Sequence, residues 1–156
     1  MRKVIFIILI VMLVLALSSS QYAQEKDPAE LLKTFADSLN AGNINATMAQ
    51  FNDDATVKLY FGNILPSESY VGSEKIRSWM EELVAFNFKI EIEVLQVLGD
   101  IAVTRSKSWS DQTIQLGIAP LEMIEVYPIK DGKLKGFVSI LTDETLAKLK
   151  DALASK

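Results

Sequence analysis

The sequence predicts an α+β fold, in which helices come first and an antiparallel sheet follows. Before residue 85, three segments carry apolar residues at the spacing of one helix face, whereas from Phe86 onward apolar and charged residues alternate. Helices followed by a run of strands are the pattern of an α+β domain. We expect the sheet to curve around the helices, which gives a cone with a pocket at its open end.

Three helices are expected in the first half of the chain. Asp27 and Pro28 are suited to the N-cap and the first position of a helix, and Gly42 is suited to the left-handed residue that ends it. Asn43 can cap a short second helix, and Ser73 opens a third. The apolar residues of the third helix share one face: Ile76, Trp79, Met80, Leu83 and Val84.

The strands are bounded by turn-forming residues. We expect Asn52-Asp53-Asp54 to form a turn, because these side chains bond to nearby backbone amides, and a strand to follow over 55–61. Residues 62–72 are expected to form a loop. The other strands, joined by hairpin turns at 99–100 and 130–133, are expected at 88–94, at 101–110, at 113–129 with a bend at Ala119-Pro120, and at 134–141. A closing helix carries Leu146, Leu149 and Leu153.

The N-terminal segment has the pattern of a secretory signal peptide. Arg2 and Lys3 precede the uncharged apolar run from Val4 to Leu17, and small and polar residues follow. The run is shorter than the ~20 residues of a membrane span. We therefore expect residues 1–23 to be a signal peptide and residues 24–156 to be one domain that is secreted or otherwise extracytoplasmic, in a periplasm or at a cell surface. An uncleaved membrane anchor is the alternative.

Composition argues against several classes of chemistry. The chain has no cysteine and no histidine, so it lacks the thiol nucleophile, the usual catalytic base and the usual zinc ligands. Its formal net charge of −4 becomes −6 without Arg2 and Lys3, and this acidic balance argues against nucleic acid as a partner. No Gly-rich nucleotide motif is present. We expect no cofactor, no metal, and contact with a membrane only if the leader is retained.

Four short motifs mark the ends of the expected elements. They are LNAGN at the end of the first helix, FNDDATV at the first strand, GSEKIR at the start of the third helix and IKDGK at the last hairpin. Together they resemble the NTF2-like superfamily, which includes the SnoaL-like polyketide cyclases and the ketosteroid isomerases. The resemblance covers roughly residues 28–142. It implies a cystatin-like cone, in which a strongly curved antiparallel sheet wraps around three N-terminal helices and a short C-terminal helix follows.

The resemblance implies no single function, because this fold hosts isomerases, cyclases, dehydratases and non-catalytic binding modules. It does assign the catalytic groups of ketosteroid isomerases to three positions. The phenol corresponds to Phe35, the base to Leu59, and the neutral carboxylic acid to Ile124, with one residue of uncertainty. All three are apolar here, and the reaction needs a base and hydrogen-bond donors in a dry pocket. We therefore expect no such activity unless Glu122 or Glu125 serves from a shifted register.

Five residues are expected to line the pocket of the cone. They come from two predicted helices and two predicted strands: Phe35, Leu59, Trp79, Leu83 and Ile124. An apolar lining of this kind suits an apolar ligand, and ordinary core packing is the alternative interpretation.

Alternation along the expected strand 113–129 decides which acids face the pocket. If Ile124 points inward, Glu122 does so too, and burial would raise the pKa of its carboxyl. Glu122 is therefore the catalytic candidate. Glu125 and Tyr127 are then expected on the outer face, where Glu125 can pair with Arg105. Lys107 and Trp109 are expected on the same outer face.

Three functions remain open at this point. The first is a non-catalytic module that binds a small apolar ligand or a partner in the cone. The second is a SnoaL-like or isomerase-like enzyme with a relocated carboxylate, and the third is a dimeric structural domain with a filled cone. Sheets of this kind often pair across their outer faces, so we also expect a homodimer.

Overall fold

The computed structural model of the chain describes residues 27–154, so the leader expected over residues 1–23 lies outside the described residues. Within 27–154, no helix is long and apolar enough to cross a membrane. The elements in chain order are α2 (Pro28–Asn40), α3 (Ile44–Met48), β1 (Phe51–Tyr60), β2 (Glu68–Val71), α4 (Ser73–Ala85), β3 (Lys89–Leu98), β4 (Ile101–Trp109), α5 (Asp111–Gln115), β5 (Leu121–Lys130), β6 (Lys133–Leu141) and α6 (Asp143–Ala154).

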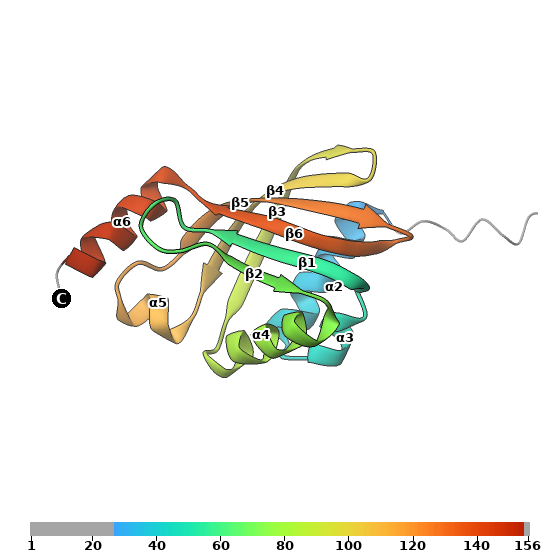
Figure 1. Cartoon of the computed structure of the whole chain (residues 1–156), viewed down its shortest axis with the longest axis horizontal. Coiled ribbons are helices and arrows are strands. Elements are labelled where there is room, and N and C mark those ends of the chain that lie inside the picture. The colour runs from blue at the N-terminus through green and yellow to red at the C-terminus, as the bar shows by residue number, and fades with distance from the viewer. Residues whose placement is uncertain (1–26, 155–156) are drawn as a thin grey trace, which may run out of the picture.

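The strands form one curved, open sheet in the order β2-β1-β6-β5-β4-β3. All neighbouring strands are antiparallel except β1 and β6, which run parallel. Helix α2 packs against β3, and α4 packs against β1 and β2. Helices α5 and α6 lie at the end of the molecule away from α2 and α3 (Figure 1). The α+β class, the curved sheet, the three helices before β3 and the closing helix are therefore confirmed.

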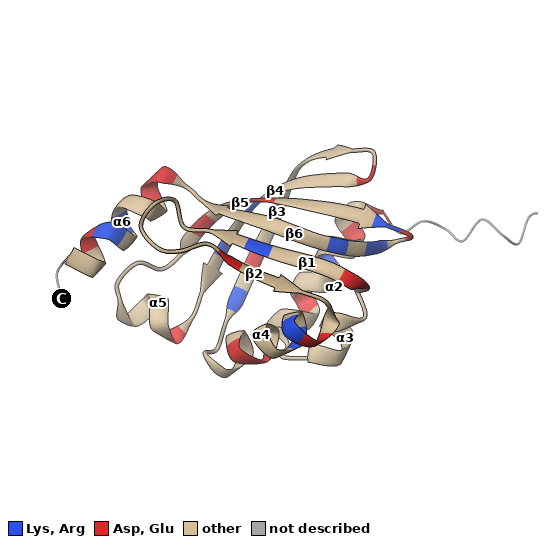
Figure 2. Cartoon of the chain, viewed as in Figure 1, with Lys and Arg blue, Asp and Glu red and all other residues tan. Residues whose placement is uncertain are grey.

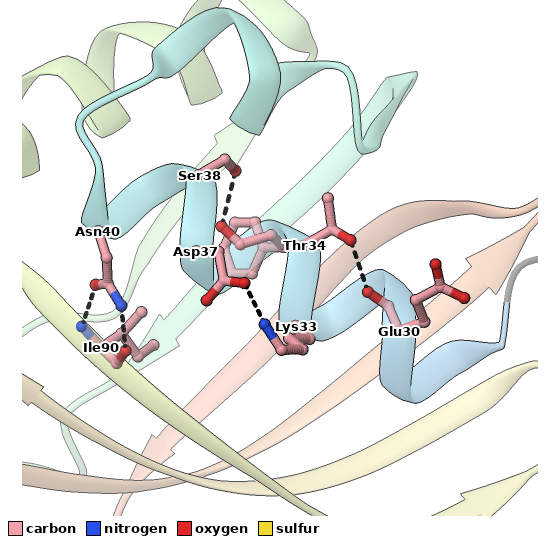
Figure 3. Close-up of polar contacts among 8 residues, drawn as sticks. Glu30, Lys33, Thr34, Asp37, Ser38, Asn40 and Ile90 are labelled. Carbon is pink, nitrogen blue, oxygen red and sulfur yellow. Dashed lines mark hydrogen bonds and ion pairs between the residues drawn. The ribbon is translucent and has the colours of Figure 1, made fainter.

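Two N-caps and one side-chain clamp fix the first helices. Asp27 accepts a hydrogen bond from the Ala29 amide (3.2 Å), and Asn43 accepts one from the Ala46 amide (3.1 Å). At the end of α2, Asn40 donates to the Ile90 carbonyl and accepts from the Ile90 amide, each at 2.8 Å (Figure 3). Asn40 thereby pairs the backbone amide and carbonyl of Ile90 in the edge strand β3 and holds that strand against α2.

The start of β1 differs from the sequence prediction. Asn52, Asp53 and Asp54 belong to β1 and do not form a turn before it. The pairing of β1 with β6 shifts register between Phe51 and Thr56, so this stretch is an irregular part of the strand. Beyond it the two backbones approach closely, and a Cβ atom at Gly136 would lie 1.8 Å from the Thr56 carbonyl oxygen.

Two further segments also differ from the expectation. The predicted loop 62–72 contains the short strand β2, which adds an edge to the sheet. The predicted single strand over 113–129 is wrong, because α5 occupies its first part. Ser110 and Thr113 form a capping box, in which each side chain bonds the backbone amide of the other. After α5 the chain passes through a cis Ala119-Pro120 bond into β5.

The main core lies between α2, α4 and the concave face of the sheet. Phe35 is at its centre, with ring centroids 5.6 Å from Phe51 and 6.3 Å from both Tyr127 and Phe137. A second, smaller apolar cluster joins α6 and the segment after α5 to the ends of β5 and β6: Ile118, Met123, Leu141 and Leu149. A cavity lies between the two clusters and is lined by residues of both.

Candidate functional site

Strand β4 carries a row of hydroxyl side chains on the concave face of the sheet. Thr104, Ser106 and Ser108 alternate with exposed or half-buried neighbours, and their own exposed fractions are 0%, 0% and 2%. In an antiparallel pair, opposite residues share a face, and β5 places Glu125 opposite Thr104. The row therefore brings a glutamate to the inside of the cone.

Glu125 is 2% exposed and is surrounded by hydroxyl donors. The Tyr127 hydroxyl donates to Glu125 Oε2 at 2.7 Å, and the Ser106 hydroxyl donates to the same oxygen. Ser139, which lies opposite Glu125 on β6, supplies a third hydroxyl. Each donor comes from a different place in the sheet, so the fold itself positions the carboxyl.

Burial decides the acidity of this carboxyl. Desolvation raises the pKa of Glu125 above its ordinary value, and the hydrogen bonds from Ser106, Tyr127 and Ser139 oppose that rise without cancelling it. Burial and the neighbouring carboxyl also raise the pKa of Tyr127 well above 10, so this phenol stays neutral and acts as a donor. Glu125 is thus a carboxyl that can take up or release a proton above the usual glutamate range.

A cavity of about 300 Å³ lies directly against Glu125. Ser108 and Ser139 also contribute polar atoms to its wall. Most of the remaining wall is apolar or aromatic and includes Phe35, Leu39, Leu59, Trp79, Met80, Leu83, Phe88, Ile90, Leu121, Met123, Phe137 and Leu141. An apolar pocket with a few convergent polar groups is the usual form of a small-molecule site.

The lining residues that are exposed mark the open end of this cavity. They are Tyr60, Glu68 and Gln112. Trp79 stacks on Tyr70 with ring centroids 5.0 Å apart, and the Tyr70 hydroxyl donates to Glu68 at 2.6 Å. Burial and Glu68 together raise the pKa of Tyr70. The open end therefore combines aromatic faces with a carboxylate.

Four of the five predicted pocket residues line the cavity, namely Phe35, Leu59, Trp79 and Leu83. The prediction for Ile124 is wrong, because this residue does not contribute to the cavity wall. It lies opposite Arg105 on the outer face of the sheet. The prediction assigned the inward positions of β5 one residue away from where the structure has them. Because side chains alternate along a strand, an error of one residue assigns each of them to the wrong face.

The same shift overturns the prediction for Glu122. Glu122 lies opposite Lys107 on the outer face, and its carboxylate is 3.4 Å from the Lys107 ammonium. Glu125 and Tyr127, which were expected outside, lie inside, so the expected pair between Arg105 and Glu125 does not form. Arg105, Lys107 and Trp109 are on the outer face as expected. Because side chains alternate along a strand, this placement implies that the hydroxyl residues at 104, 106 and 108 face inward. That row was the signal that could have located Glu125.

The described residues hold no group of three or more acidic side chains close enough together to bind a metal ion. Figure 2 shows acidic and basic residues interspersed over the strands and helices. Inside the cone, the arrangement offers one buried carboxyl, several hydroxyls and an apolar wall. It can therefore form hydrogen bonds or an ion pair with a ligand, or exchange one proton with it.

Comparison with known proteins gives a family and a fold. The family model of the SnoaL-like domain matches residues 32–137. No curated protein matches the chain. Among solved structures, an NTF2-like protein of unknown function from Cytophaga hutchinsonii is 17% identical with a TM-score of 0.59, and the match covers 76% of this chain and 93% of that one.

Two further structures support the same fold. A cystatin-fold protein from Novosphingobium aromaticivorans is 20% identical with a TM-score of 0.58, over 71% of this chain and 95% of that one. An LEH-like epoxide hydrolase from M. tuberculosis is 11% identical with a TM-score of 0.56, over 80% and 90%. At these identities the likeness extends to the fold alone.

Proposed function

The chain belongs to the SnoaL-like domain family, and we propose that it is a non-catalytic binding module. Its cavity holds a small, mainly apolar ligand with one polar group against Glu125. The observation that carries this proposal is the cavity of about 300 Å³, whose wall is mainly apolar, with one buried carboxyl and a few hydroxyls inside and Glu68 and Gln112 at the open end. A filled cone, the structural alternative, does not fit such a cavity.

The positions that catalysis would need support the binding interpretation. The position of the isomerase base is Leu59 and that of the phenol is Phe35, and both are apolar and line the cavity. Glu125 is the one buried carboxyl in the cavity wall, and the hydroxyl of its neighbour Tyr127 donates to that carboxyl and not to a ligand. A proton taken from one atom of a substrate needs an acceptor and a stabilising donor.

The binding proposal is tested with native mass spectrometry and a neutral probe. The natively purified protein is analysed for a retained small molecule, and 2-naphthol is then titrated by calorimetry. Leu59→Trp, which fills the cavity, should weaken 2-naphthol binding at least tenfold. Leu65→Trp is the matched control, because Leu65 is 40% exposed and does not line the cavity. No retained molecule together with no heat from 2-naphthol would overturn the proposal.

A proton-transfer enzyme is the second candidate, and the environment of Glu125 favours it. A carboxyl with a raised pKa beside an apolar cavity is suited to general acid–base catalysis. The experiment is exchange of the α-hydrogens of 2-tetralone for deuterium, followed by NMR. Exchange that the protein accelerates and that Glu125→Gln abolishes would establish the enzyme. Exchange no faster than in buffer without protein would rule out the enzyme.

The homodimer expected through the outer sheet face stays a prediction. Ile124 lies on that face opposite Ile140, which is 47% exposed, and Tyr60 lies next to Ile140 on β1. An exposed apolar strip of this kind supports a contact between two sheets. Sedimentation at tens of micromolar tests it, and a monomer at that concentration would end the idea.

An extracytoplasmic location is likewise proposed. The support is the apolar run from Val4 to Leu17 after Arg2 and Lys3. Intact-mass measurement of the protein expressed with its leader in a bacterial host tests this proposal. A mature chain that begins near residue 24 and appears outside the cytoplasm is expected, and an uncleaved cytoplasmic chain would contradict it.

A further inference from the structure

The cavity has a charge pattern that narrows the class of ligand. We infer that the polar group of the ligand is a protonated amine, so that the cone takes up a small apolar ammonium compound whose cation pairs with Glu125. This inference rests on the proposed binding function and specifies the chemistry of the same cavity.

The first observation is the sign of the charges in the cavity wall. Among the described residues that line it, the two carboxyl side chains are those of Glu125 inside and Glu68 at the open end. No lysine or arginine lines the cavity. A wall with carboxyls and no cation repels carboxylate, sulfate and phosphate ligands and attracts cations.

The second observation is that the buried carboxyl has no counter-ion of its own. The ion pairs formed within residues 27–154 involve other acids, such as Glu122 with Lys107 and Asp54 with Lys135. A buried carboxylate without a cation is costly, and a charge brought by a ligand would offset that cost. Glu125 is thus the kind of group that a ligand cation stabilises.

The third observation concerns the remaining hydrogen-bonding capacity of Glu125. A carboxylate offers about four lone-pair positions, and three hydroxyls, of Ser106, Tyr127 and Ser139, already donate to this one. One further donor, such as an ammonium N–H, completes the set. Ser108 also lines the cavity and adds a hydroxyl acceptor to its wall.

The open end of the cavity suits the passage of a cation. Trp79 lines the cavity and stacks on Tyr70, whose hydroxyl donates to Glu68 at the open end. Aromatic faces attract ammonium groups electrostatically, through the negative face of the ring. An ammonium compound would therefore contact Trp79 and Glu68 at the open end of the cavity and Glu125 at its inner end.

The test compares three probes of one shape, with the full-length protein and isothermal titration calorimetry at pH 7. They are cyclohexylmethylamine, which is a cation, cyclohexylmethanol, which is neutral, and cyclohexanecarboxylate, which is an anion. The amine should bind at least tenfold more tightly than the alcohol, and the carboxylate should give no measurable binding.

Two variants on one strand assign the preference to Glu125. Glu125→Gln removes the charge and should reduce the amine affinity to that of the alcohol measured with the same variant. Glu122→Gln is the matched control, because Glu122 lies on the outer face, and it should leave all three affinities unchanged. An amine preference that survives in Glu125→Gln overturns the inference.

The wild-type protein supplies a test that does not depend on the folding of a variant. As the pH is lowered through the raised pKa of Glu125, the ratio of amine to alcohol affinity should fall, because Glu125 takes up a proton while the amine stays charged. Glu68 and Tyr60 are the other titratable residues that line the cavity, both at its open end, and Tyr127 touches Glu125 directly. Repeating the series with Glu68→Gln should preserve the fall, and a ratio that does not vary with pH overturns the inference.

The outcomes separate this inference from the proposed function. If the alcohol binds and the amine binds no more tightly, the cavity is a binding site but not one for amines. If the carboxylate binds as well as the amine, the argument from charge is wrong and the cavity function stands. If none of the three probes nor 2-naphthol binds, the proposed function itself fails.

Discussion

Two glutamates three residues apart on β5 occupy opposite environments. Glu122 is on the outer face, where its side chain is 33% exposed and faces the Lys107 ammonium at 3.4 Å. Glu125 is on the inner face, 2% exposed, and is held by hydroxyls without a cation. The same side chain is therefore a solvated surface charge at one position and a buried, ligand-facing acid at the other.

At these two positions the face of the strand, and not the residue type, decides the chemistry of the carboxyl. Water screens the outer pair, which limits its contribution to folding to roughly 0–1 kcal/mol. The inner carboxyl has exchanged water for hydroxyls and apolar walls, so its protonation state depends on the fold and on any ligand.

The largest effect is expected when each glutamate is replaced by lysine. Glu125→Lys places a cation among three hydroxyls and apolar side chains with no acid beside it, so we expect a loss of at least about 3 kcal/mol in the free energy of unfolding. Glu122→Lys is the matched control on the exposed face, where repulsion from Lys107 should cost less than about 1 kcal/mol. Urea denaturation followed by circular dichroism measures both. Equal losses would mean that the two positions do not differ in burial.

A smaller effect is expected when one donor to Glu125 is removed. Tyr127→Phe deletes a buried hydroxyl that donates at 2.7 Å and leaves the carboxyl less well satisfied, at a cost of about 1–3 kcal/mol. Tyr70→Phe is the matched control, because its hydroxyl donates to the exposed Glu68. It should cost less than about 1 kcal/mol. Thermal or urea unfolding measures both losses. A Tyr127→Phe variant as stable as the wild type would contradict the hydrogen bond from Tyr127 to Glu125.

The pH dependence of stability should distinguish the inner position from the outer one. Burial raises the pKa of Glu125 in the folded protein above its ordinary value of 4.5. The stability that the protonated form provides is thus full below pH 4.5 and is lost as the pH rises through the folded pKa. Relative to Glu125→Gln, the wild type should lose up to about 1.4 kcal/mol per pH unit across this interval. Glu122→Gln retains Glu125 and should show the same fall as wild type, whereas parallel curves for wild type and Glu125→Gln would contradict a raised pKa.

Most of the fold could be predicted from the sequence because local signals agree with one another. The Asp27 and Asn43 caps, the apolar face of α4 and the two hairpin turns each depend on a few adjacent residues. The segment before β5 could not be predicted in this way. Its alternating residues resemble a strand, but the capping box of Ser110 and Thr113 starts a helix instead.

The site was predicted in part, for a related reason. Phe35, Leu59, Trp79 and Leu83 lie on elements with unambiguous faces, so their positions in the cavity followed from periodicity. The face of β5 depended on a count back from the last hairpin, and the pairing of β5 with β6 shifts register between Val126 and Ile129. A count that runs back through this irregularity assigns the residues before it, including Glu125, to the wrong face. Only the pairing of β5 with the hydroxyl row of β4 shows which face Glu125 is on.

The smallest effect is expected from neutralising the outer pair. Glu122→Gln removes a surface ion pair at 3.4 Å between side chains that are 33% and 45% exposed. Such a pair contributes about 0.5 kcal/mol at low salt, and water and ions screen it. The loss on Glu122→Gln should therefore shrink to nothing in 1 M sodium chloride, as should the loss on Lys107→Gln. Because the double variant removes the same interaction once, its loss should be smaller than the sum of the two single losses. A loss above about 2 kcal/mol that salt does not reduce would mean that Glu122 is not a solvated charge. Glu122 and Glu125 would then not differ in their exposure to water as the structure indicates.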